Sequence, residues 1–268
     1  MSFLAYLLDE IGEDVNSPSY LRGLPERRVF PPGSLKQSIA RAPHRWAVVV
    51  EYKRRSPGAT IPELPERTVS EFAHITAGAG ASGLSCVATR PHFDGAVTDV
   101  LALSRASRLP ILFKDFVIDE RQIEAASRAG ASAVLLIARL ETERRLDTPL
   151  SVLSDAAHRA GLEVLLELHA PEELMVAETV NADMFGVNLR DLDGLRFEPE
   201  IAARTVREGY RRRPLLGLSG VDGPRAARAW RALGVDGILV GSGFARARQP
   251  AHFLSAILES GEGTEERR

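Results

Sequence analysis

Eight short apolar runs recur along the chain and constrain its fold more than any other feature. They are rich in Val, Leu and Ile and do not alternate with polar residues, which is typical of parallel strands buried on both faces. Successive runs begin about 20 to 35 residues apart, the length of one strand–helix unit. The runs are Ala47–Glu51, Gly83–Ala88, Pro110–Phe113, Ala133–Ile137, Glu163–Leu168, Met184–Val187, Leu215–Leu218 and Gly237–Val240.

The stretches between the runs carry helix signals. Thr68 with Glu71 three residues later forms a capping box, and Asp119 and Gly130 bracket another helix. Eight repeats favour an α/β fold of one closed (β/α)8 TIM barrel over an open doubly wound sheet. The 268 residues suit such a barrel, which typically needs about 250. We expect an N-terminal helical extension over 1–45, the barrel over 46–258 and a frayed polar tail over 259–268.

Composition excludes several classes of partner. The formal net charge of −2 argues against nucleic acid, whose backbone requires clustered positive charge. No apolar run approaches the roughly 20 residues of a membrane span. The single cysteine, Cys86, lies in an apolar run and is expected to be a core residue. Without a leader-like start, the chain is predicted to be cytoplasmic, and to be a monomer or a weak homo-oligomer.

Function in a barrel concentrates where strands end, so charged residues at those points are candidates. Glu51 and Lys53 end the first run on the same strand face, and form either a structural ion pair or an acid–base couple. Lys114 ends the third run, where it either extends to solvent or joins them. Two neighbouring lysines should lower the pKa of at least one, which suits general acid catalysis.

The fifth and sixth runs add further polar groups. Glu167 lies in an otherwise apolar run and needs a positive partner. His169 follows it, and we interpret it as a solvated loop histidine without a role in chemistry. Asn188 can donate and accept hydrogen bonds, and Arg190 can hold an anion.

The last two runs end in small residues, Ser219-Gly220 and Gly241-Ser242. Small residues let backbone N–H groups approach an anion, and the loops after strands seven and eight form the common phosphate site of barrel enzymes. Together the two motifs predict a phosphorylated small-molecule substrate.

As an ordered set, these motifs resemble the indole-3-glycerol-phosphate synthase family of tryptophan biosynthesis. The resemblance covers about residues 40 to 255, and the N-terminal stretch is similar to the family's helical extension. The motifs that carry it are Glu51-x-Lys53-x-x-Ser56-Pro57, Lys114-Asp115-Phe116, Glu167-x-His169, Gly186-Val187-Asn188-x-Arg190, Ser219-Gly220-Val221 and Leu239-Val240-Gly241-Ser242.

The resemblance implies a carboxy-lyase acting on 1-(2-carboxyphenylamino)-1-deoxyribulose 5-phosphate. Ring closure, loss of carbon dioxide and loss of water would give indole-3-glycerol phosphate without a metal or organic cofactor. Lys114 would protonate the sugar carbonyl, and Lys53 would contact the phosphate and act as the second acid. The remaining implied roles are proton handling by Glu51 and Glu167, substrate contact by Asn188, electrostatic support by Arg190, and phosphate binding by Ser56, Ser219, Gly220, Gly241 and Ser242.

Four places depart from the family pattern, among them Leu189 and the loop Phe93-Asp94-Gly95-Ala96, and the other two are candidates for substrate contact. Leu218 replaces the usual glutamate before Ser219, and Arg90 stands where an acidic residue is usual after Thr89. Both changes make the mouth of the site more positive. Three functions are compatible with the sequence: the synthase itself, a paralogue of specialised metabolism acting on a different N-aryl aminodeoxyribulose phosphate, and a non-catalytic barrel that binds a phosphorylated ligand.

Overall fold

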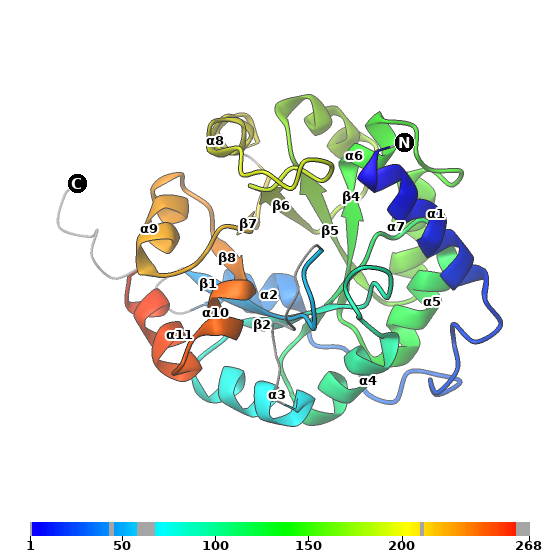
Figure 1. Ribbon diagram of the computed structural model, residues 1–268, viewed down its shortest axis with the longest axis horizontal. Helices are drawn as coiled ribbons and strands as arrows, with labels where there is room; N and C mark the ends of the chain where they lie inside the picture. The colour runs from blue at the N-terminus through cyan, green and yellow to red at the C-terminus, as the bar shows by residue number, and fades with distance from the viewer. Residues whose placement is uncertain (1, 43–45, 58–67, 210–211, 261–268) are drawn as a thin grey trace.

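The chain folds into a closed barrel of parallel strands. The computed structural model describes residues 2–42, 46–57, 68–209 and 212–260. Within these residues eight strands pair in chain order, and the last pairs with the first (Figure 1). This confirms the predicted (β/α)8 barrel. The strands are β1 (Ala47–Tyr52), β2 (Gly83–Val87), β3 (Ile111–Lys114), β4 (Ala133–Ile137), β5 (Glu163–Leu168), β6 (Met184–Asn188), β7 (Leu215–Leu218) and β8 (Gly237–Val240).

Helices follow the strands and surround the barrel (Figure 1). The predicted capping box joins Thr68 and Glu71 at the start of α3, and Gly130 ends α5 with a φ of 89°. The helices are α1 (Phe3–Asn16), α2 (Leu35–Ala40), α3 (Val69–Gly78), α4 (Val97–Ala106), α5 (Glu120–Ala129), α6 (Ala138–Thr142), α7 (Leu150–Arg159), the 3-10 helix η2 (Pro171–Glu178), α8 (Pro199–Glu208), α9 (Pro224–Ala232), α10 (Ser242–Arg246) and α11 (Pro250–Glu259).

The two helices before β1 lie at opposite ends of the barrel. α2 covers the amino-terminal end of the strands, where the backbone N–H of Lys36 donates to Glu163 Oε2 at 3.0 Å. α1 covers the loops that follow β2 and β3, because its buried leucine, isoleucine and valine side chains pack against Phe93, Phe116 and Ile118. The predicted polar tail lies outside the described residues, apart from Glu259 at the end of α11 and Ser260 after it.

Apolar side chains form separate layers outside and inside the barrel. The outer core lies between strands and helices and includes Cys86, which is fully buried as predicted. The inner core fills the barrel and includes Leu135, Leu218 and Leu239. The inner core therefore forms a floor beneath the carboxyl ends of the strands, where the polar candidates lie.

Candidate active site

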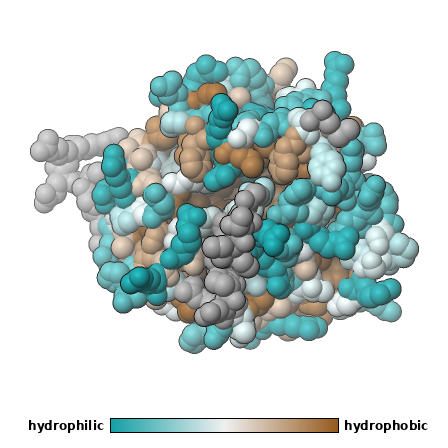
Figure 2. Space-filling model, in the orientation of Figure 1, coloured by the Kyte–Doolittle hydropathy of each residue, from teal (hydrophilic) through white to brown (hydrophobic). Residues whose placement is uncertain are grey.

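A cavity of about 530 Å³ opens at the carboxyl ends of the strands. On the face of the molecule shown in Figure 2, hydrophobic residues gather near the centre, ringed by hydrophilic ones. The cavity brings together all the predicted site residues except two. Those that line it are Glu51, Lys53, Ser56, Lys114, Glu167, Asn188, Arg190, Ser219, Gly220, Gly241 and Ser242.

A carboxylate lies between two lysines at one side of the cavity. Glu51 of β1 is 4% exposed, with Oε1 3.2 Å from Lys53 Nζ and Oε2 3.0 Å from Lys114 Nζ at the end of β3. Gly241 makes room for this carboxylate, because a Cβ at that position would lie 2.7 Å from Glu51 Oε1. The arrangement places two ammonium groups beside one anion at the cavity wall.

The charges in this cluster stabilise one another. Burial alone would raise the pKa of Glu51, but Lys114 and Lys53 lower it to about 2. Burial would lower the pKa of Lys114, but Glu51 and Glu167 outweigh that effect and raise it. The predicted lowering of a lysine pKa is therefore wrong for Lys114, because Glu51 and Glu167 outweigh burial and the charge of Arg190.

A second carboxylate, Glu167 of β5, faces the cavity from the other side. Its Oε1 accepts a hydrogen bond from Asn188 Nδ2 at 3.0 Å and lies 3.2 Å from His169 Nε2. Burial acts to raise the pKa of Glu167, but His169, Lys114 and Asn188 together lower it. Glu167 is therefore held as an anion at neutral pH.

His169 was predicted to be a solvated loop residue, and that prediction is wrong. The residue follows β5 directly and is only 3% exposed. Burial lowers its pKa, but Glu167 and Glu173 raise it to about 9. The signal in the sequence was the carboxylate at each side, two residues before and four residues after the histidine.

Small residues line the part of the cavity that follows the carboxyl ends of β7 and β8. Ser219 and Gly220 both have left-handed backbones, with φ of 67° and 71°. Trp230 Nε1 donates to the Ser219 carbonyl oxygen at 3.3 Å, and a Cβ at Gly220 would lie 2.4 Å from Leu189. A non-glycine left-handed residue is uncommon and concentrates at functional sites. Ser219, Gly220, Gly241 and Ser242 all line this end of the cavity.

Lys53 connects that end to the charged cluster. Its Nζ donates to Ser242 Oγ at 3.4 Å while it pairs with Glu51. Ser56 lines the cavity from the segment that follows β1. Arg190 lines it too, with its guanidinium carbon 4.7 Å from the ring centroid of Phe197.

The two departures that were predicted to contact the substrate do not line the cavity. Arg90 forms an ion pair with Asp14 of α1, and its side chain is 68% exposed. Leu218 is 1% exposed and belongs to the inner core, although Asn188 and Leu239, its partners on the flanking strands, both line the cavity. The structure therefore does not bring Arg90 and Leu218 together.

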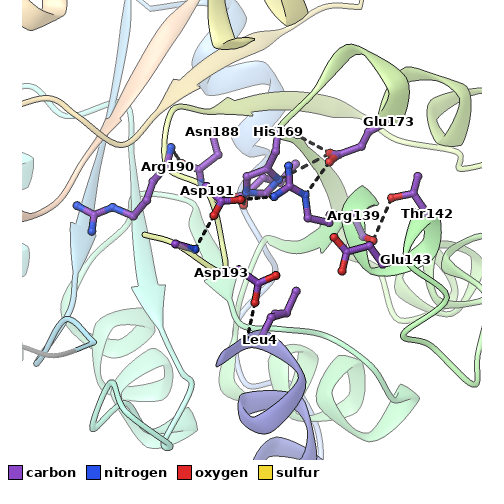
Figure 3. Close-up of polar contacts among 12 residues, drawn as sticks. Leu4, Arg139, Thr142, Glu143, His169, Glu173, Asn188, Arg190, Asp191 and Asp193 are labelled. Atoms are coloured by element: carbon purple, nitrogen blue, oxygen red, sulfur yellow. Dashed lines mark hydrogen bonds and ion pairs between the residues drawn. The ribbon is translucent and has the colours of Figure 1, made fainter. Parts of the chain in front are cut away.

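Sequence reasoning missed three charged residues beside the site. Arg139 of α6 has Nε 3.0 Å from Glu173 Oε1 and Nη1 2.5 Å from Asp191 Oδ1 (Figure 3). Asp191 itself lines the cavity. The sequence pattern does not connect these residues, since they lie far apart and follow three different strands.

Within the described ranges, no cluster of three or more His, Cys, Asp and Glu residues is placed to hold a metal ion. None of the helices described here is both long enough and apolar enough to cross a membrane.

Solved structures with similar folds are distant in sequence. A thiamine phosphate pyrophosphorylase from Pyrococcus furiosus matches with a TM-score of 0.57 and 18% identity, covering 82% of this chain and 96% of that one. The tryptophan synthase alpha chain from Legionella pneumophila matches with a TM-score of 0.60 and 14% identity, covering 87% of this chain and 98% of that one. At these identities the likeness shows the fold alone.

Sequence comparison gives a more specific result. Indole-3-glycerol phosphate synthase 2 of Streptomyces coelicolor is 37% identical over 213 residues, which cover 79% of this chain and 80% of that protein. The indole-3-glycerol phosphate synthase of Bacteroides thetaiotaomicron is 34% identical over 232 residues, or 85% of this chain and 86% of that protein. The family model of indole-3-glycerol phosphate synthase matches residues 9–257. The chain therefore belongs to the indole-3-glycerol phosphate synthase family.

Proposed function

We propose that the protein converts 1-(2-carboxyphenylamino)-1-deoxyribulose 5-phosphate into indole-3-glycerol phosphate, as a carboxy-lyase of tryptophan biosynthesis. Family membership supports the overall reaction. The observation that carries the proposal is the placement of Glu51 between Lys53 and Lys114 at the cavity wall. A carbonyl that becomes a hydroxyl and then leaves as water needs a proton donor twice, and two ammonium groups meet that need.

Lys114 is the proposed acid for ring closure. As the aromatic carbon attacks the sugar carbonyl, a carbon–carbon bond forms and the carbonyl oxygen takes a proton from the Lys114 ammonium group. The raised pKa of Lys114 keeps this group protonated at neutral pH. Loss of carbon dioxide then returns the bonding electrons to the ring and restores its aromaticity.

Lys53 is the proposed acid for dehydration. The new hydroxyl leaves as water with a proton from Lys53, while a carboxylate accepts the proton lost as the final double bond forms. Glu167 suits that role because its lowered pKa leaves it ionised, and because it faces the cavity opposite the lysines. Glu51 keeps Lys114 charged between turnovers.

The remaining cavity residues support binding in this proposal. Ser56, Ser219, Gly220, Gly241 and Ser242 hold the phosphate through hydroxyl and backbone N–H groups, and Lys53 adds positive charge beside Ser242. Arg190 faces the substrate carboxylate. Asn188 already donates to Glu167 and accepts from the backbone N–H of Arg190, so it orients both residues.

A turnover assay tests the function directly. Wild-type protein with the anthranilate-derived substrate should produce the fluorescence of the indole product, and Glu124→Gln, a surface change, should leave the rate unchanged. Substrate bound without turnover would contradict the proposal and support a non-catalytic barrel. Turnover only with a different aryl group would support the paralogue. A cytoplasmic location and a monomeric or weakly oligomeric state stay predictions.

A further inference from the structure

His169 lies behind the cavity, between two carboxylates. Its Nε2 is 3.2 Å from Glu167 Oε1 and its Nδ1 is 3.7 Å from Glu173 Oε2. Both contacts are ion pairs by distance, since neither ring nitrogen has a hydrogen-bond partner of good geometry among the described residues. Its side chain is 1% exposed, and it does not contribute to the cavity lining. A neutral imidazole carries one N–H and can serve only one of these carboxylates, whereas an imidazolium carries two N–H groups and a positive charge.

Glu173 cannot turn away from the histidine, because two hydrogen bonds fix it. Its Oε2 accepts the backbone N–H of His169 at 2.7 Å, and its Oε1 accepts Arg139 Nε at 3.0 Å. Figure 3 shows Glu173 pointing back from η2 toward His169 and Arg139. Arg139 is held in turn by Asp191, after β6. The protein itself therefore fixes the position of the Glu173 carboxylate.

Charged groups from five elements face this site. They are Glu167 on β5, Glu173 on η2, Arg139 on α6, Asp191 after β6, and Lys114 on β3, which acts on Glu167. Glu167 and Glu173 contact the imidazole directly and favour its charged form. Arg139 pairs with Glu173, so its positive charge reduces the effect of Glu173 but not that of Glu167. The electrostatic environment and the geometry both favour a protonated ring.

Glu167 is oriented by this arrangement. Its Oε1 accepts a hydrogen bond from Asn188 and forms an ion pair with His169. Its Oε2 has no hydrogen-bond partner among the described residues. Glu167 lines the cavity. One oxygen is therefore anchored in the protein, and the other is a buried acceptor that no described residue satisfies.

We propose that His169 is a positioning residue, whose imidazolium holds Glu167 ionised at neutral pH and anchors one of its oxygens so that the other serves as proton acceptor. The kinetic part of this inference rests on the proposed function; the protonation of His169 and its effect on Glu167 do not. A histidine that is merely structural would be neutral, or would leave the titration of Glu167 unchanged when replaced.

The kinetic test replaces the charge but keeps a hydrogen-bonding side chain. His169→Gln should lower kcat about tenfold with KM changed less than about twofold, because Glu167 acts in the chemical steps. The acid limb of the kcat/KM profile should move to higher pH by about one unit, because Glu167 without the imidazolium holds its proton more tightly. A fall in kcat with an unmoved acid limb would overturn the proposal.

A matched control is available on the outside of the barrel. His158 of α7 has Nε2 2.9 Å from Asp183 Oδ2, so it is also paired with a carboxylate, but it does not line the cavity. His158→Gln should leave kcat and the acid limb at their wild-type values. Equal kinetic changes in the two variants would show a general effect of losing a histidine and would overturn the proposal.

A spectroscopic test works without turnover. In wild-type protein, ¹⁵N shifts of His169 should show protons on both ring nitrogens at about pH 7.5. The ¹³C carboxyl signal of Glu167, assigned by its loss in Glu167→Gln, should titrate at higher pH in His169→Gln than in wild type. A neutral ring in wild type would overturn the proposal even if the variant fails to fold. If wild type shows no turnover, only the proposed function fails, and these signals still decide the protonation and anchoring role.

Discussion

The two charged clusters beside the cavity have opposite arrangements of charge. On one side a carboxylate, Glu51, lies between Lys53 and Lys114. On the other an imidazole, His169, lies between Glu167 and Glu173. All three members of the first cluster line the cavity, whereas only Glu167 of the second does. The first cluster can therefore exchange its internal partners for substrate groups, and the second is fixed before substrate arrives.

This difference separates two ways of controlling protons. In the lysine cluster the charges are available to a substrate, so binding can change which partner each ammonium group faces. In the histidine cluster, hydrogen bonds from the backbone and from Arg139 hold Glu173 in place. Preorganised charges of this kind need no rearrangement during the reaction. Substitutions in the two clusters should consequently affect different kinetic quantities.

The largest effect is expected from Lys114→Ala. A general acid contributes about 10²- to 10⁴-fold, so kcat should fall by at least about 100-fold. KM should change little, because the proposed proton transfer occurs in the transition state. Lys36→Ala is the control, since Lys36 pairs with Asp183 at the far end of the barrel and its side chain is 47% exposed. A variant that keeps most of its kcat would contradict the assigned role.

Glu51→Gln should have the next largest effect and should change the pH profile. The carboxylate is what offsets burial and raises the pKa of Lys114, so its loss should lower that pKa. Lys114 must be protonated to act as an acid, so the basic limb of the kcat profile should move to lower pH. At neutral pH we expect a loss of about 10- to 100-fold. If the basic limb stays at its wild-type pH in both Glu51→Gln and Glu51→Asp, Glu51 does not set the pKa of Lys114.

The sequence was informative where function follows directly from strand ends. Apolar runs located Glu51, Lys114 and Asn188, because each polar residue interrupts or closes a buried strand and the barrel gathers strand ends on one face. Ser219-Gly220 and Gly241-Ser242 were found in the same way. All of these residues line the cavity.

The misread residues depend on contacts between distant segments. Burial of His169 requires η2 to return Glu173 to it, and the position of Glu173 requires Arg139 from the preceding repeat. The environment of Arg90 is set by Asp14 of α1, which lies over the loop after β2. A local pattern contains no information on how such elements pack, so solvent exposure and partners could not be read from it.

Leu218→Glu should have a smaller effect and tests the floor between the two clusters. Leu218 is buried, but its neighbours Asn188 and Leu239 both line the cavity, so a longer side chain can reach toward the lysines. If it restores a contact worth about 1.4 kcal/mol, kcat/KM on the anthranilate-derived substrate should rise up to tenfold. Burying an ionised carboxylate should also reduce the free energy of unfolding, by several kcal/mol where no lysine pairs with it. A fall in kcat/KM of similar size would favour a pocket rebuilt for another aryl group.

The smallest effect is expected from Arg90→Ala, which separates the rim from both clusters. Arg90 does not contribute to the cavity lining, and its guanidinium pairs with Asp14 while most of its side chain is exposed. Exposed ion pairs contribute about 0–1 kcal/mol to stability, so the variant should unfold almost like wild type. Its kcat/KM should stay within about twofold, because a change in this pair can reach the substrate only through the packing of α1. Asp14→Asn should reproduce the Arg90→Ala phenotype, since each change removes the same pair. A loss of tenfold or more in Arg90→Ala, with Asp14→Asn unaffected, would show instead that Arg90 leaves Asp14 to contact the substrate.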